Sequence, residues 1–102
     1  MGNITISDSV ISEIAYRTIC QIYGVEPENK EFKKNKKNIQ IDRTPEDHVV
    51  ITIKLEVPYG ENIVEFSKNI MKNVAESVSQ MTDKVVDAVN VAIVSVYEEK
   101  GE

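Results

Sequence analysis

Two apolar segments joined by a helical pattern occupy residues 48–97 and constrain the fold more than any other part of the chain. Between Val49 and Val57 every second residue is aliphatic and polar residues fall between them, which is the period of a half-buried strand. Pro58-Tyr59-Gly60 ends this run. The segment from Val85 to Tyr97 is apolar at most positions and β-branched at many, which predicts a second strand.

The residues between these strands follow a helical period. Apolar side chains recur three or four positions apart from Ile63 to Met81, which predicts an amphipathic helix. Asn62 is a candidate N-cap, and Glu65, three residues on, is its capping-box partner. We therefore expect a strand–helix–strand unit to organise the domain.

The amino-terminal part predicts a short strand followed by another helix. Asn3 to Ile6 alternates polar and apolar residues and is long enough only for an edge strand. Ser7 is a suitable N-cap, Asp8 complements the positive end of the helix dipole, and Gly24 is a suitable C-cap. Apolar residues spaced at helical intervals lie between these caps.

The predicted order of elements is β-α-β-β-α-β, and the fold class is α+β. Ile39 to Ile41 alternates briefly, and a turn-rich stretch separates it from the strand at residues 48–57, which predicts an antiparallel hairpin. We expect three substantial strands plus the short first one, with both helices on one face of the sheet. The same order occurs in ferredoxin-like folds, although the first strand here is short for a central position.

Length and composition indicate one domain in a reducing compartment. With 102 residues the chain is long enough for a single core, and its one cysteine cannot form an internal disulfide. Within residues 1–102 we expect a lysine-rich loop at 26–38 and a charged, frayed tail at 98–102. A basic leader and a long apolar run are absent from the sequence, so we expect a soluble, cytoplasmic protein without direct membrane insertion.

The loop carries a concentrated positive charge in a chain whose net charge is −5. Its lysines form a possible anion contact for nucleic acid, an acidic partner or anionic lipid; they are Lys30, Lys33, Lys34, Lys36 and Lys37. The alternative is a solvated, mobile loop, which we favour because no aromatic ladder, arginine or glycine-rich clamp accompanies the lysines. The overall negative charge also disfavours nucleic acid as a partner.

The last predicted strand presents apolar residues on both of its faces. Two helices can cover one face, but the neighbouring strand has Thr52, Lys54 and Glu56 on its other face. Each valine left exposed to water would lose ~1.5 to 3 kcal/mol of stabilisation from burial, so we expect another surface to cover these apolar residues. We predict an interface there, in a homo-oligomer or with a protein partner, formed by Val86, Ala88, Ala92, Val94 and Val96. The alternative is a twisted sheet that buries both faces within one chain.

The sequence predicts no catalytic, cofactor or metal site. His48 is the only histidine and follows two carboxylates, but further ligands in a geometric set are not evident. Cys20 lies on the first helix without a positioned base, so we interpret it as a buried small residue and not as a nucleophile. Tyr59-Gly60 lacks the further glycines of a phosphate-binding loop and is interpreted as a turn.

Several short motifs, in this order and spacing, resemble the signature of the alkaline shock protein family of bacterial envelope-stress proteins. The family's opening is similar to Ile4-Thr5-Ile6-Ser7 and Tyr23-Gly24-Val25, and the later motifs are Val57-Pro58-Tyr59-Gly60, Ile63, Val74, Val78, Met81-Thr82, Val89-Asn90-Val91 and Val94. The chain departs from the family pattern at Glu26-Pro27 and the lysine run, where members often have a small-residue, glycine-rich segment. It departs again at Asp83-Lys84, because members often have glycine directly after the Met-Thr pair.

The resemblance implies a non-enzymatic, cytoplasmic bacterial protein with a role in envelope homeostasis or the stress response. Some such proteins reach the inner face of the membrane through a membrane-spanning partner, and other branches are implicated in regulating fatty-acid synthesis through acetyl-CoA carboxylase. It implies no catalytic residues and no cofactor. Our leading hypothesis is an interaction protein that self-associates and docks to a partner; the alternatives are regulation of fatty-acid synthesis and a nucleic-acid-binding module using the Lys30–Lys37 loop.

Overall fold

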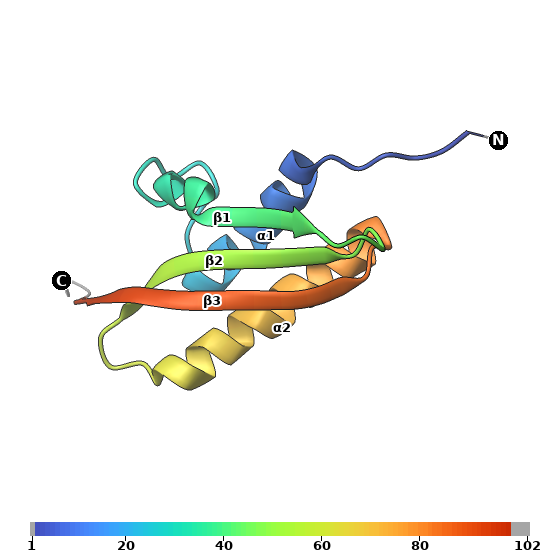
Figure 1. The fold of residues 1–102 in the computed structure, drawn as a ribbon. Coiled ribbons are helices and arrows are strands. Elements are labelled where there is room, and N and C mark those ends of the chain that lie inside the picture. Colours follow the sequence, from blue (N-terminus) through green and yellow to red (C-terminus); the bar gives the residue numbers. More distant parts are fainter. Residues whose placement is uncertain (1, 99–102) are drawn as a thin grey trace.

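The computed structural model describes residues 2–98, in which two long helices and a short 3-10 helix accompany a three-stranded sheet (Figure 1). In chain order the elements are α1 (Asp8–Tyr23), η1 (Phe32–Asn38), β1 (Ile39–Arg43), β2 (Val49–Pro58), α2 (Ile63–Thr82) and β3 (Val86–Tyr97). The α+β class predicted from the sequence is confirmed.

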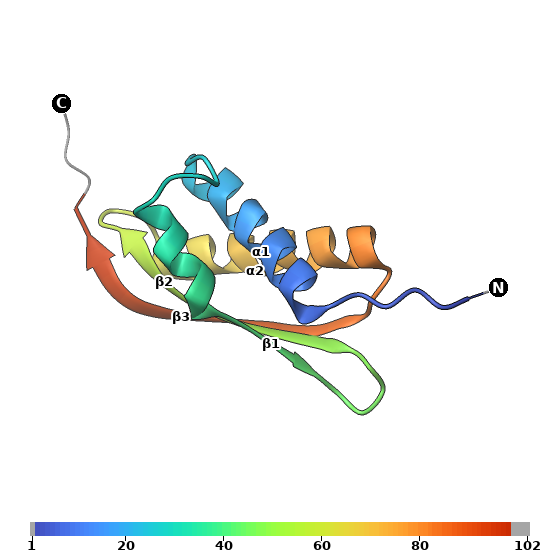
Figure 2. The same cartoon turned by 90° about the horizontal axis from the view of Figure 1, so that it is seen from above.

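The sheet has the order β1-β2-β3. Strands β1 and β2 form the expected antiparallel hairpin, and β2 pairs with β3 in parallel because α2 carries the chain back to the starting end of the sheet. Both long helices lie on the same face, which leaves the other face of the sheet open (Figure 2). The predicted placement of the helices is therefore confirmed.

The helix caps form as the sequence predicts. The Ser7 side chain accepts a hydrogen bond from the Val10 N–H at 3.4 Å, and the Asn62 side chain accepts one from the Glu65 N–H at 3.0 Å. Gly24 ends α1 in the left-handed region at φ 70°. Asp83 ends α2 at φ 59°, a conformation that aspartate tolerates better than most residues.

The core lies between the helices and the sheet. All five aliphatic residues that alternate along β2 from Val49 to Val57 are buried, at most 2% exposed. Helix α2 meets them with Ile70, Val74 and Val78, each 0% exposed, and α1 contributes Ile11 and Ile19 among others. The strand period and the helix period read from the sequence thus define the two sides of one core.

Two expectations differ from the structure. Asn3–Ile6 forms no strand: this segment runs away from the sheet (Figure 1), and Ile4 is 88% exposed. Four residues that bury so little apolar surface cannot offset the entropy of ordering them.

The lysine-rich stretch at 26–38, expected as a loop, contains η1, because Phe32 packs on Tyr23 with ring centroids 5.0 Å apart. The tail expected at 98–102 falls, except for Glu98, outside the described residues.

Candidate interaction surfaces

Strand β3 forms one edge of the sheet along its whole length of 12 residues. Its inner edge pairs with β2, and within residues 2–98 no other strand lies along its outer edge. The strand lies at the edge because the α2 crossover brings it to the side of β2 that the hairpin partner β1 leaves free. An unpaired edge of this length presents a row of backbone donors and acceptors to other chains.

Two β-bulges interrupt the pairing of β3 with β2. The register passes from Val86 to Ala88 and from Ile93 to Ser95, while the facing residues on β2 are consecutive, so Asp87 and Val94 have no opposite residue. Each extra residue changes which side chains of β3 face the helices. The simple alternation assumed for this strand is therefore wrong at two positions.

The predicted interface residues consequently do not share one face. Val86 and Val96 lie opposite the buried Val49 and Val57, on the helix side, whereas Ala88 and Ala92 lie on the open side. Val94 occupies the second bulge. The large apolar side chains of the set that stay exposed are Val94 at 59% and Val96 at 47%. Contact of these residues with another chain stays a prediction.

The open face of the sheet has a mixed character. Thr52 and Lys54 of β2 lie beside Asn90 and Ala92 of β3, and Glu56 lies beside Ser95. Such a face is compatible with water and does not need a second apolar layer. The exposed edge of β3, more than the open face, is thus the apolar feature that calls for an explanation.

The lysine-rich segment divides into one anchored lysine and four exposed ones. The Lys36 Nζ lies 2.7 Å from a Glu13 carboxylate oxygen and 5.3 Å from the centroid of the Tyr16 ring. Lys36, followed by Arg17, lowers the pKa of the Glu13 carboxyl group. Within residues 2–98 the others form no ion pair; they are Lys30, Lys33, Lys34 and Lys37.

A groove of about 700 Å³ runs along the outer side of the two helices. Ile14 and Thr18 of α1 and Thr82 of α2 line it, and the exposed side chains of Val10 and Met81 lie at its rim. No feature of the sequence indicated this groove. Val10 falls off the apolar face of α1, so only the packing of the two helices brings it beside Met81.

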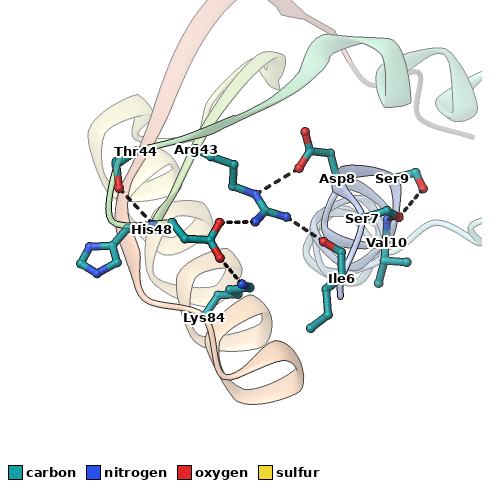
Figure 3. Close-up of polar contacts among 10 residues, drawn as sticks. Ile6, Ser7, Asp8, Ser9, Val10, Arg43, Thr44, His48 and Lys84 are labelled. Carbon is teal, nitrogen blue, oxygen red and sulfur yellow. Dashed lines mark hydrogen bonds and ion pairs between the residues drawn. The ribbon is translucent and has the colours of Figure 1, made fainter. Parts of the chain in front are cut away.

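A cluster around Arg43 joins three segments that are distant in the sequence (Figure 3). The guanidinium donates to an Asp8 carboxylate oxygen at 3.1 Å, to an Asp47 carboxylate oxygen at 2.7 Å and to the Ile6 carbonyl at 2.8 Å. Asp47 also binds the ammonium group of Lys84, and Lys84 followed by Arg43 lowers the pKa of the Asp47 carboxyl group. The sequence offered no signal for this cluster, since its partners lie up to 37 residues apart.

Comparison with protein families agrees with this architecture. A family model for the alkaline shock proteins, described by a cell envelope-related function, matches residues 1–98. The chain belongs to the alkaline shock protein family. A comparison with curated proteins finds no match. The family match covers every element described here, from the segment before α1 to the end of β3, so the resemblance stated from the motifs is confirmed.

The two candidate reactive residues of this family member are both held in place. The His48 Nδ1 lies 2.9 Å from an Asp87 carboxylate oxygen, at the start of β2 and β3. Cys20 is 1% exposed, and burial raises the pKa of its thiol, which keeps it in the less reactive protonated form. Among residues 2–98 no three histidine, cysteine or acidic side chains are grouped as metal ligands.

The helices within residues 2–98 include no candidate membrane span. Neither α1 nor α2 combines the length and the hydropathy that a helix needs to cross a bilayer.

Proposed function

We propose that this alkaline shock family member is a non-enzymatic interaction protein of the cell envelope, which self-associates and docks to a protein partner. The exposed edge of β3 is the observation that supports this proposal most directly. A long valine-rich edge strand costs solubility and invites aggregation unless another chain covers it. An interaction role explains why such an edge is present.

The non-enzymatic part of the proposal is supported by the state of the reactive groups. Cys20 lies inside the core as a protonated thiol, and His48 is engaged by Asp87 at the surface. These two side chains are on different elements: Cys20 packs in the core, and His48 makes a local hydrogen-bond contact with Asp87. Docking to a membrane-anchored partner on the cytoplasmic side is proposed from the family resemblance.

The decisive experiment compares strains that carry the chain with a single exposed valine replaced. Val94→Lys charges the β3 edge, and Val10→Lys charges the groove between the helices at a valine that is 48% exposed. We expect the Val94→Lys strain to match a deletion strain in its sensitivity to a cell-wall antibiotic, and the Val10→Lys strain to match the wild type. Equal protein levels and equal circular dichroism are required of both variants.

Three results separate the parts of this proposal. A deletion strain with normal envelope resistance would remove the envelope role. Full resistance in the Val94→Lys strain would remove β3 as the contact, and failure of Val10→Lys alone would transfer the contact to the helical groove. A change in fatty-acid content without envelope sensitivity would favour regulation of fatty-acid synthesis.

A further inference from the structure

We infer that the outer edge of β3 pairs antiparallel with the same edge of a second copy, so that two sheets of three strands join into one of six. This dimer rests on the self-association in the proposed function and specifies its surface and its occupant. We infer a second copy as the partner because two β3 edges are complementary when they run antiparallel. Their charges, their lengths and the positions of the adjacent α2 helices are compatible in that arrangement.

The charge of β3 favours its own copy. Between Val86 and Tyr97 the strand carries one charged residue, Asp87, near its start. An antiparallel arrangement places the two Asp87 side chains at opposite ends of the paired strands, where they do not repel each other. The central part, residues 88–93, is uncharged and lies between the two bulges, so it is the regular stretch available for pairing.

The opposite edge of the sheet is protected where the β3 edge is not. Strand β1 has only five residues, and its sequence Ile39–Arg43 includes Gln40, Asp42 and Arg43. Short strands with charged side chains are the common way in which edges avoid pairing. The contrast between the two edges of one sheet identifies β3 as the edge open to another chain.

Symmetry restricts the register to two choices. In an antiparallel pair related by a two-fold axis, the axis passes through one residue, and side chains opposite each other share a face. Centring the pair within residues 88–93 places the axis at Asn90 or at Val91. The first choice sets Asn90 opposite itself, and the second sets Asn90 opposite Ala92, on the open face in both cases.

Helix α2 is placed to complete this dimer. It crosses the sheet diagonally, beginning beyond the β3 edge and ending behind β2 (Figure 1). Its first residues are apolar and exposed, with Ile63 at 43% and Val64 at 59%. In the dimer the start of each α2 lies under the β3 of the other copy, where these side chains cover the helix side of that strand.

The area supports a dimer only if the helices take part. Even the full strand of 12 residues is only about 40 Å long and a sheet is ~10 Å thick, so strand pairing alone buries at most about 400 Å² on each copy. A stable interface needs about 800 Å² on each side. The exposed start of α2 supplies the remaining contact, which is why we infer a joint strand and helix interface.

Disulfide trapping on the purified full-length chain tests the pairing. Cysteines at Asn90 or Ala92 lie on the open face, Gln40→Cys at the opposite edge is the matched control, and the wild type controls for the buried Cys20. Opposite residues have Cα atoms about 4.5 to 5.5 Å apart, within the range that a disulfide spans. With the axis at Asn90, we expect Asn90→Cys alone to cross-link about tenfold faster than Gln40→Cys. With the axis at Val91, we expect the same of a mixture of Asn90→Cys and Ala92→Cys. Cross-linking at the rate of Gln40→Cys in both cases would overturn the dimer.

Light scattering on the same chain gives an independent readout. At high micromolar concentration we expect the wild-type mass to approach twice 11.5 kDa, and Asn90→Lys to halve it because like charges then face each other near the axis. Gln40→Lys is the control and should leave the mass unchanged.

A wild-type chain that stays monomeric overturns the dimer and leaves docking to a partner in the cell intact. A chain that dimerises through β3, but whose deletion strain has normal envelope resistance, refutes the proposed function and leaves the dimer intact. Cross-linking of Asn90→Cys only to a different protein in the host would also overturn the second copy as the occupant.

Discussion

At the scale of single residues, Arg43 is the charged side chain that connects the most separate segments within residues 2–98. Its guanidinium holds the segment before α1 through Ile6, the first residue of α1 through Asp8, and the β1–β2 turn through Asp47. Asp47, which has a positive φ of 66°, also binds Lys84 and so connects the turn to the start of β3. A planar fork with several donors can serve these partners at once, and a single point charge cannot.

Arg43→Met should therefore lower the free energy of unfolding by about 1 to 2 kcal/mol, because it removes charge-assisted hydrogen bonds at a side chain that is only 24% exposed. Urea denaturation monitored by circular dichroism measures the change. Arg17→Met is the matched control, since Arg17 is 58% exposed and within residues 2–98 its one ion pair is with Glu13; its effect should stay within about 0.5 kcal/mol. Equal losses for the two variants would contradict the bridging role of Arg43.

At the scale of elements, η1 is attached to α1 by two kinds of contact. The Phe32 ring packs against the rings of both Tyr16 and Tyr23, with centroid distances of 6.2 and 5.0 Å. Lys36 pairs with Glu13 and lies over the Tyr16 ring. The lysines of this segment thus differ in role: Lys36 fixes the element, and its exposed neighbours are left to interact with solvent or a ligand.

The exposed lysines are the test of nucleic-acid binding. The variant with Lys33, Lys34 and Lys37 all changed to Gln keeps Lys36 and its contacts, so its fold should be preserved. Because the chain has a net charge of −5, we expect neither the wild type nor this variant to bind single-stranded RNA or duplex DNA in a filter assay at low salt. Salt-dependent binding by the wild type that the triple variant loses would establish the alternative function.

At the scale of the whole molecule, the buried Tyr16 and the partly buried Tyr23 link stability to alkaline pH. Burial raises the pKa of Tyr16 from 10.0 to about 12, and it also raises the pKa of Tyr23. Above its usual pKa the phenol of the unfolded chain loses a proton that the folded chain keeps. Unfolding then releases protons, so the contribution of Tyr16 to stability is complete below pH 10 and is lost as the pH rises to about 12.

Urea midpoints measured across this alkaline range should fall with pH in the wild type, and the fall should be shallower in Tyr16→Phe. The comparison uses slopes, because the variant also loses the hydrogen bond that the Tyr16 hydroxyl donates to the Pro27 carbonyl at 2.8 Å, at a cost of about 1 to 3 kcal/mol at every pH. Tyr59→Phe, at a side chain that is 75% exposed, is the control and should keep the wild-type slope. An unchanged slope in Tyr16→Phe would exclude this linkage.

Across these scales, features set by neighbouring residues were predictable and features set by distant partners were not. Ser7, Asn62 and Gly24 cap helices as expected, since a cap depends on residues within one turn. The Arg43 cluster and the absence of a strand at Asn3–Ile6 depend on where other segments lie, and neither could be anticipated. The bulges at Asp87 and Val94 belong to the same group, because they arise from the mismatch between β3 and β2.

The sequence by itself determined the class of the fold, the helices, and the alternation that buries Val49 to Val57, because these depend on periods repeated within short stretches of chain. It also contained the family signature over residues 1–98. Only the tertiary structure decided that β3 is an open edge, and which of Val86, Ala88, Ala92, Val94 and Val96 stay exposed. The order of the strands and the two bulges set those outcomes, and both result from pairing with β2 and not from any property of β3 alone.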